Sequence, residues 1–176
     1  RACAAGEVIG VAFVDPEQVS LFNDGATAAF VTGSARVMAE GERALDLFAS
    51  IVREGTFCAL DVKADVHRVY PVDTAEAARV TDEEVLAMAG FDLGLAGYVL
   101  NSSTSAYTYD SLMESVAGAT LPAAETDGER AAVQATAARM LQGLLEEALK
   151  KDGTWEAYAD IDLPLVGVLS CMERVG

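Results

Sequence analysis

The segment TFCALDVKADVHRVYP (residues 56–71) predicts a strand followed directly by a short helix. Its first five residues, TFCAL (56–60), are typical of a short buried strand. Asp61 is a good N-cap, because its carboxylate can accept a hydrogen bond from the first helical turn, and Pro71 ends a helix because it lacks an N–H. The predicted helix carries Asp65 two residues before His67, the only histidine of the chain. This predicted strand–helix unit therefore carries a carboxylate, Asp65, that is a candidate site residue.

The residues before this unit predict strands joined by tight turns. Asp15-Pro16 and Asn23-Asp24-Gly25 are turn signals that separate short segments rich in β-branched or aromatic residues. We expect an antiparallel meander of three strands, EVIGVAFV (7–14), QVSLFND (18–24) and TAAFVTG (27–33).

The other segments predict helices. Apolar residues recur at helical spacing within 35–55, and Gly55 is a plausible C-cap. Thr81 and Glu84 form a capping box for a short helix. Further helices are expected at 91–103, 109–118, 129–151 and 155–175, with Gly153 ending the long one and a polar loop at 119–128. Strands followed by alternating helix and strand predict one α/β domain with a mixed sheet covered by helices.

The charge of the chain argues against direct nucleic-acid binding. The 176 residues contain 28 acidic and 12 basic side chains, a net charge of −16. Nucleic-acid binders usually carry a basic stripe that neutralises phosphates, and the densest basic cluster here is LKKDG (149–153). We therefore expect the isolated chain to bind DNA weakly or not at all.

Several other classes of protein are disfavoured. The longest apolar runs, such as VIGVAFV (8–14), are far shorter than a membrane span, so no membrane association is expected. Cys3, Cys58 and Cys171 are widely spaced, which favours reduced thiols, and with one histidine they do not suggest a zinc site. Arg1 in place of an initiating Met suggests a fragment of a longer chain.

Three later segments resemble bacterial DNA polymerase I, the family A DNA polymerases. They are GFDLGLAGYVLNSS (90–103), YDSLMESVAG (109–118) and DIDLPLVGVLSCMERVG (160–176). The last matches an acidic-x-P-L-x-x-V-L-x-x-M-E-x-x-G pattern through residues Asp162, Pro164, Leu165, Val168, Leu169, Met172, Glu173 and Gly176. The resemblance covers residues 58–176. It implies an RNase H-like fold with a five-stranded mixed sheet flanked by helices. It also implies a 3′→5′ exonuclease-like domain over residues 1–158 and the first helix leading into a polymerase domain over 159–176.

The resemblance also implies where a nuclease site would lie. Family members use two divalent ions, which need about four carboxylates from separate elements. The family supplies Asp-x-Glu on the first strand, an Asp on the helix after the fourth strand, and Tyr-x-x-x-Asp on the long C-terminal helix. ALDVKAD (59–65) resembles the second motif and places Asp65 at its aspartate, although Asp61 replaces the usual Asn.

The other two motifs are doubtful or missing. Asp15 and Glu17 have the Asp-x-Glu spacing, but Pro16 between them suits a turn better than a strand. In the long helix the tyrosine position is Ala132 or Val133 and the aspartate position is Thr136 or Ala137. Arg139 follows closely, and a fixed cation there is expected to compete with a metal ion.

These residues favour an inactive domain. Asp65 is interpreted as vestigial, or as a solvated acid on an exposed helix face, and His67 as a partly exposed helix residue. The domain would then be a degenerate, cofactor-free proofreading exonuclease, acting as a structural platform for the DNA-directed DNA polymerase domain of the same chain in replication and repair.

In this interpretation DNA is met through the parent polymerase in the bacterial cytoplasm, at the nucleoid. VGVLSCM (166–172) should pack against the polymerase domain. A separated fragment could dimerise through that helix, which sedimentation at high concentration would test.

Two alternatives remain open. One is an active Mg²⁺- or Mn²⁺-dependent 3′→5′ exonuclease that uses Asp15, Glu17, Asp61 and Asp65. The other is an acidic protein-interaction module, which would carry an exposed apolar patch apart from the surface that faces the polymerase.

Overall fold

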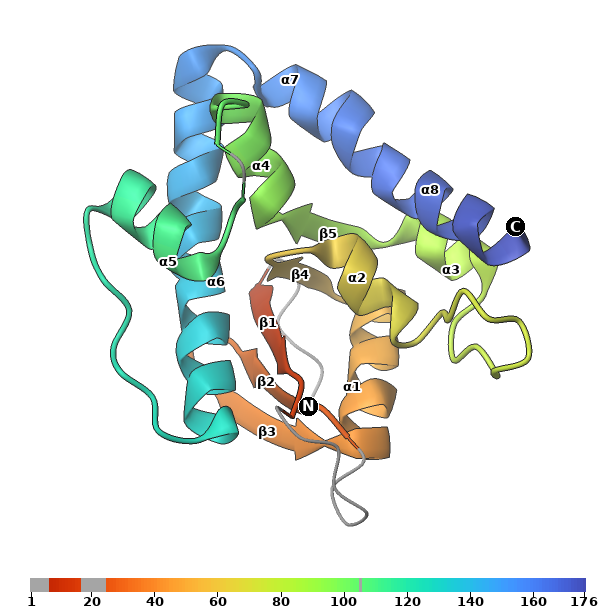
Figure 1. Ribbon diagram of the computed structural model, residues 1–176. Helices are drawn as coiled ribbons and strands as arrows, with labels where there is room; N and C mark the ends of the chain where they lie inside the picture. The colour runs from red at the N-terminus through yellow and green to blue at the C-terminus, as the bar shows by residue number, and fades with distance from the viewer. Residues whose placement is uncertain (1–6, 17–24, 105) are drawn as a thin grey trace.

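The computed structural model describes residues 7–16, 25–104 and 106–176, and these form one mixed sheet flanked by helices (Figure 1). The strand order is β3-β2-β1-β4-β5. β2 pairs antiparallel with β1 and β3, whereas β4 pairs parallel with β1 and β5. The strands are β1 (Val8–Val14), β2 (Thr27–Val31), β3 (Arg36–Glu40), β4 (Thr56–Ala59) and β5 (Ala89–Asp92). The prediction of an α/β architecture with a mixed sheet is confirmed.

Helices cover both faces of this sheet. In Figure 1 the long helix α6 stands on one side of the sheet, and α1 stands on the other. The helices are α1 (Gly41–Glu54), α2 (Val62–His67), α3 (Asp82–Ala87), α4 (Leu93–Leu100), α5 (Tyr109–Leu112), α6 (Asp127–Asp152), α7 (Trp155–Ala157) and α8 (Leu163–Val175). Two π-helical turns, η1 (Met113–Ala117) and η2 (Tyr158–Asp162), extend α5 and link α7 to α8.

The central strand β1 is buried on both faces. Ala12 and Val14 belong to the apolar cluster that contains α6, while Ile9 and Val11 belong to the cluster under α1 and α2. Successive side chains of a strand point to opposite faces, so a strand between two helical layers needs apolar residues throughout. This explains why VIGVAFV shows no alternation of apolar and polar residues.

Most predicted element boundaries agree with the structure. The carboxylate of Asp61 accepts a hydrogen bond from the Ala64 N–H at 2.9 Å and caps α2. Thr81 and Glu84 form the predicted capping box at the start of α3. Gly153 ends α6 with a φ of 82°, a left-handed conformation that glycine adopts without strain.

Two predicted helices begin later than expected. Residues 36–40 form strand β3, since all five pair with β2, and the helix starts only at Gly41. Phe91 and Asp92 belong to β5, which pairs with β4, and α4 starts at Leu93. In both places strand pairing overrides a local helical pattern, through a short hairpin with β2 at residues 36–40 and through pairing with the distant β4 at Phe91 and Asp92. The strand predicted at 18–24 lies outside the described residues.

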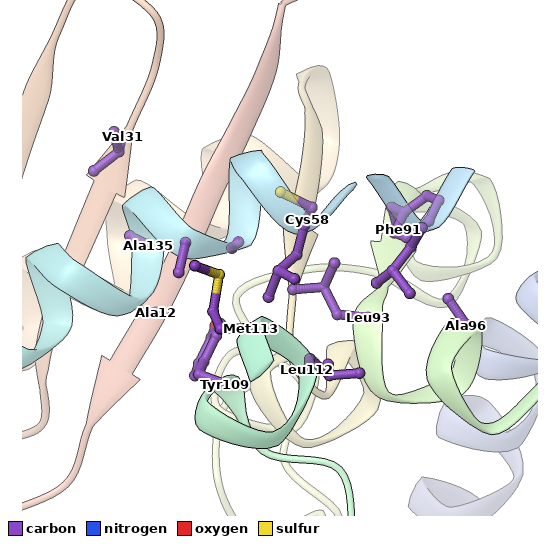
Figure 2. Packing of buried hydrophobic residues seen from close by; sticks show 14 of the residues in the cluster. Ala12, Val31, Cys58, Phe91, Leu93, Ala96, Tyr109, Leu112, Met113 and Ala135 are labelled. Carbon is purple, nitrogen blue, oxygen red and sulfur yellow. The ribbon is translucent and has the colours of Figure 1, made fainter. Parts of the chain in front are cut away.

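Close contact between β1 and α6 depends on one glycine. A Cβ atom at Gly10 would lie 2.0 Å from the carbonyl oxygen of Ala135 and 2.8 Å from Cγ of Arg139. The α6 backbone therefore lies almost against the strand. Ala12 and Ala135 face this interface with small side chains (Figure 2).

We predict that Gly10→Ala lowers the free energy of unfolding by about 3 kcal/mol, because the clash is with backbone atoms that cannot rotate away. Gly143→Ala, on the exposed side of α6 with no atom within 4 Å of the new Cβ, is the matched control. It should raise stability by up to about 1 kcal/mol through helix propensity. Urea unfolding measures both. Equal effects from the two substitutions would contradict the close approach of α6.

Candidate functional site

Three aspartates lie at the same edge of the sheet. Asp15 follows β1, Asp61 follows β4 and Asp92 is the last residue of β5. These three strands are parallel, so their carboxyl ends meet at one edge. Ligands of open α/β sheets commonly bind at this edge. The helix that follows β4 adds Asp65, so the fold gathers three of the four acids considered for the active alternative.

Asp92 is buried, and its carboxylate bonds to the backbone at the start of two helices, α2 and α4. Its Oδ2 accepts a hydrogen bond from the Val62 N–H, and its Oδ1 accepts one from the Leu95 N–H, both at 2.8 Å. The carboxylate therefore caps α4 and also bonds to the first residue of α2. Burial raises the pKa of Asp92 to about 6, although the bonds from the backbone lower it. Sequence analysis assigned this residue no role. The signal was present, because an aspartate just before a helical segment is a typical N-cap.

Asp65 is more buried than the sequence suggested. Only 14% of its side chain is exposed, so the interpretation as a solvated acid on an open helix face is wrong. Burial raises its pKa to about 7, while the neighbouring Arg68 guanidinium lowers it. The nearby charges of Asp61 and Asp92 add to the rise. Asp65 is thus held in a site that disfavours its charge.

One arginine contacts two of the three described carboxylates that the sequence singled out as site candidates. Arg68 donates from Nη1 and Nη2 to the two oxygens of Asp15, at 2.7 and 2.8 Å. Its Nε donates to Oδ1 of Asp65 at 3.3 Å. The guanidinium also lies over the ring of Phe13, 4.8 Å from its centre. The two hydrogen bonds from the Arg68 guanidinium hold the pKa of Asp15 below its usual range.

Sequence analysis missed Arg68. The signal that could have revealed it is the spacing, because an arginine three residues after an aspartate lies on the same helix face.

Arg139 does not lie where the sequence predicted a competing cation. Its Nε donates to the Val8 carbonyl at 3.1 Å, and its Nη2 lies 3.9 Å from Oε1 of Glu7. Val8 begins β1 and Asp15 follows its end, roughly 20 Å away along an extended strand. The prediction that Arg139 opposes a metal at this site is therefore wrong in position, and Arg68 is the cation present. Glu17 lies outside the described residues.

Two of the four α6 positions aligned with the third family motif are buried against apolar neighbours. Ala132 and Ala137 are buried, and both belong to the cluster that includes Ala12 and Val14 of β1. The hydroxyl of Thr136 donates to the Ala132 carbonyl at 2.7 Å. Tyr109, seen in Figure 2 beside Met113, donates to the Val11 carbonyl at 3.3 Å, and burial raises its pKa. This face of β1 is filled by side chains of the core.

His67 connects α2 to the C-terminal helix. Its Nδ1 lies 3.0 Å from the Tyr70 carbonyl and its Nε2 lies 2.9 Å from Oε2 of Glu173. Oε1 of Glu173 accepts from Lys63 Nζ at 2.7 Å. The histidine side chain is 17% exposed, so it is a docking contact between helices.

Neither a metal-binding group nor a membrane-spanning helix occurs in the part of the chain that the structure describes. In these residues no three His, Cys, Asp or Glu side chains are grouped so as to hold a metal ion. No described helix combines the length and apolar character needed to cross a membrane. No protein-family model matches the chain, and no curated protein matches it.

We predict a pH dependence of stability that Asp65→Asn removes. The folded-state pKa of about 7 exceeds the ordinary value of 3.8, so the folded protein binds this proton more tightly than the unfolded chain. The stabilisation is complete below about pH 4 and is lost as pH rises through 7, on the order of 4 kcal/mol in total. Urea unfolding at several pH values measures it. The difference between wild type and Asp65→Asn carries the effect, and Glu76→Gln, at an exposed acid, should leave it unchanged. Parallel pH profiles for wild type and Asp65→Asn would contradict the burial argument.

We also predict that Arg68→Gln destabilises the fold by about 2 kcal/mol, because it leaves the mostly buried Asp65 carboxylate without its cation. Arg79→Gln is a matched control. Arg79 is equally covered, at 25% against 26% exposure, and it also contacts two acids, Glu42 and Asp46, but these are 84% and 73% exposed. Its loss should cost less than about 1 kcal/mol. Equal losses in chemical denaturation would show that Asp65 does not need Arg68.

Proposed function

We propose that this chain is a degenerate 3′→5′ exonuclease-like domain with an RNase H-like fold, acting as a structural platform for a family A DNA polymerase domain. The five-stranded mixed sheet flanked by helices agrees with the architecture implied by the sequence resemblance. The helix after β4 carries Asp65, at the place where that resemblance puts a site carboxylate. Fold and motif therefore support the same family.

The contact of Arg68 with Asp15 and Asp65 carries the argument for lost nuclease activity. Two-metal hydrolysis needs carboxylates that are free to bind two dications. Here the two acids share a guanidinium, with N–O distances of 2.7, 2.8 and 3.3 Å. A fixed positive charge between them repels an approaching dication. The chain thus supplies its own cation at the position where a metal would be needed.

The surface of α8 supports a platform role. Val166, Gly167 and Ser170 are buried within the domain, and a Cβ at Gly167 would lie 2.9 Å from the Val85 carbonyl. The segment 166–172 therefore packs partly against its own domain. The opposite face of α8 leaves large apolar side chains uncovered, namely Leu165, Val168, Leu169, Met172 and Val175, and Ile161 of η2 is exposed beside them in the sequence. Such a stripe on one helix is typical of an interaction surface, and we assign it to the polymerase domain.

The test combines Mn²⁺ titration by calorimetry with digestion of a 5′-labelled single-stranded oligonucleotide. We expect no saturable binding at millimolar Mn²⁺ and an intact oligonucleotide. Asp65→Ala should behave like the wild type, as should Glu76→Ala, the exposed-acid control. Stepwise shortening from the 3′ end that Asp65→Ala abolishes and Glu76→Ala preserves would favour an active exonuclease and overturn the proposal.

A further inference from the structure

A second surface lies along the N-terminal half of α6, away from α8. Two neighbouring hollows there share Arg36, Glu129 and Ala132. The first, about 600 Å³, opens between β3 and α6. The second, about 560 Å³, opens between α6 and the segment 121–125, which Figure 1 shows running beside the helix. Together they form one groove, here called the α6 groove.

Methionines supply much of the apolar lining of the α6 groove. Met38 lines the first hollow, and Met113 and Met140 line the second. Met38 and Met140 are 38% and 52% exposed, although each is a large apolar side chain. Methionine is flexible and polarisable, and it is common on surfaces that adapt to apolar partners. The groove is therefore suited to receive a bulky apolar side chain.

Arg36 and Arg43 give the groove an unsatisfied positive charge. The other described arginines contact an acid, a carbonyl or an aromatic ring, namely Arg53, Arg68, Arg79, Arg130, Arg139 and Arg174. Among the described residues, Arg36 and Arg43 have no such partner, in a chain whose net charge is −16.

The acids that line the groove form no ion pair with these arginines in the described contacts. The Glu129 carboxylate is used by the helix cap, where it accepts from the backbone N–H groups of Glu125 and Thr126 at 2.9 and 3.3 Å. Glu40 and Glu125 also line the groove, but in the described contacts neither forms an ion pair with Arg36 or Arg43. The two guanidinium groups are therefore available to carboxylates from outside.

The outermost strand of the sheet, β3, borders the same groove. β3 is the last strand on its side, and its five residues pair only with β2 in the part of the chain that is described. An edge strand presents backbone N–H and C=O groups to which an extended segment can add. The chemistry of the groove thus combines a strand edge, two free cations and an apolar lining.

We propose that the α6 groove binds an extended peptide segment in which acidic residues flank a bulky apolar one. The acids bind Arg36 and Arg43, and the apolar side chain enters the hollow lined by Met113 and Met140. This function is additional to the platform role and does not depend on it. Exposed ion pairs are screened by salt, so the affinity should fall as ionic strength rises.

The experiment selects peptides on the full chain and tests them on variants. A phage-displayed pool of random dodecapeptides is panned on the wild type, and an enriched peptide is synthesised and titrated by fluorescence anisotropy. We expect enriched sequences to place Asp or Glu beside Leu, Ile, Phe or Trp. Arg36→Gln with Arg43→Gln should weaken binding by about tenfold, since two charge-assisted hydrogen bonds are lost. Met140→Asp should weaken it as well.

Lys150→Gln with Lys151→Gln is the matched control, because it removes the same charge from the far end of α6 and should leave the affinity unchanged. Circular dichroism of each variant confirms folding. No enrichment above an uncoated surface would overturn the proposal. So would an enriched peptide that binds the arginine variant as tightly as the wild type.

Discussion

The close approach of α6 to β1 at Gly10 is the constraint on which the rest of the structure depends. With no Cβ at that position, the helix backbone lies almost against the strand, and the alanines of α6 keep the interface thin. Dense apolar packing of this kind stabilises the sheet from one side. It also fills the face of β1 beside the helix positions that the family resemblance assigns to a tyrosine and an aspartate. Among those positions Ala132 and Ala137 are buried in this packing, whereas Thr136 is exposed.

At the carboxyl ends of the parallel strands the chain carries several carboxylates, and each of them bonds to other groups of the same chain. Asp61 caps α2. Asp92 caps α4 and also accepts a hydrogen bond from the first residue of α2. Asp15 and Asp65 share the Arg68 guanidinium. These carboxylates therefore serve as helix caps and ion-pair partners. This supports the proposal of a retained fold with a structural role.

The distribution of arginines adds a second functional argument. In an acidic chain most guanidinium groups lie close to a carboxylate. Arg68 and Arg79 each form ion pairs with two carboxylates. Arg36 and Arg43 differ, and they lie together beside exposed methionines and a sheet edge. The apolar stripe of α8 and the α6 groove are therefore two separate surfaces, with different chemistry and different expected partners.

The sequence by itself determined the elements whose signals are local. Asp61, Thr81 with Glu84, and Gly153 mark helix ends through hydrogen bonds or backbone conformations within a few residues, so these boundaries were predicted correctly. Only the tertiary structure decided where β5 replaces a helical pattern, because its pairing with β4 joins segments about 33 positions apart. At β3 the pairing is a hairpin with β2, and it outweighs the helical spacing of residues 36–40. The tertiary structure also determined the arrangement of the candidate site. It buries Asp65, and it brings Arg68 into contact with Asp15, which lies 53 positions away in the sequence. Spacing in the sequence can suggest a carboxylate, but the cation that it meets depends on how the chain folds.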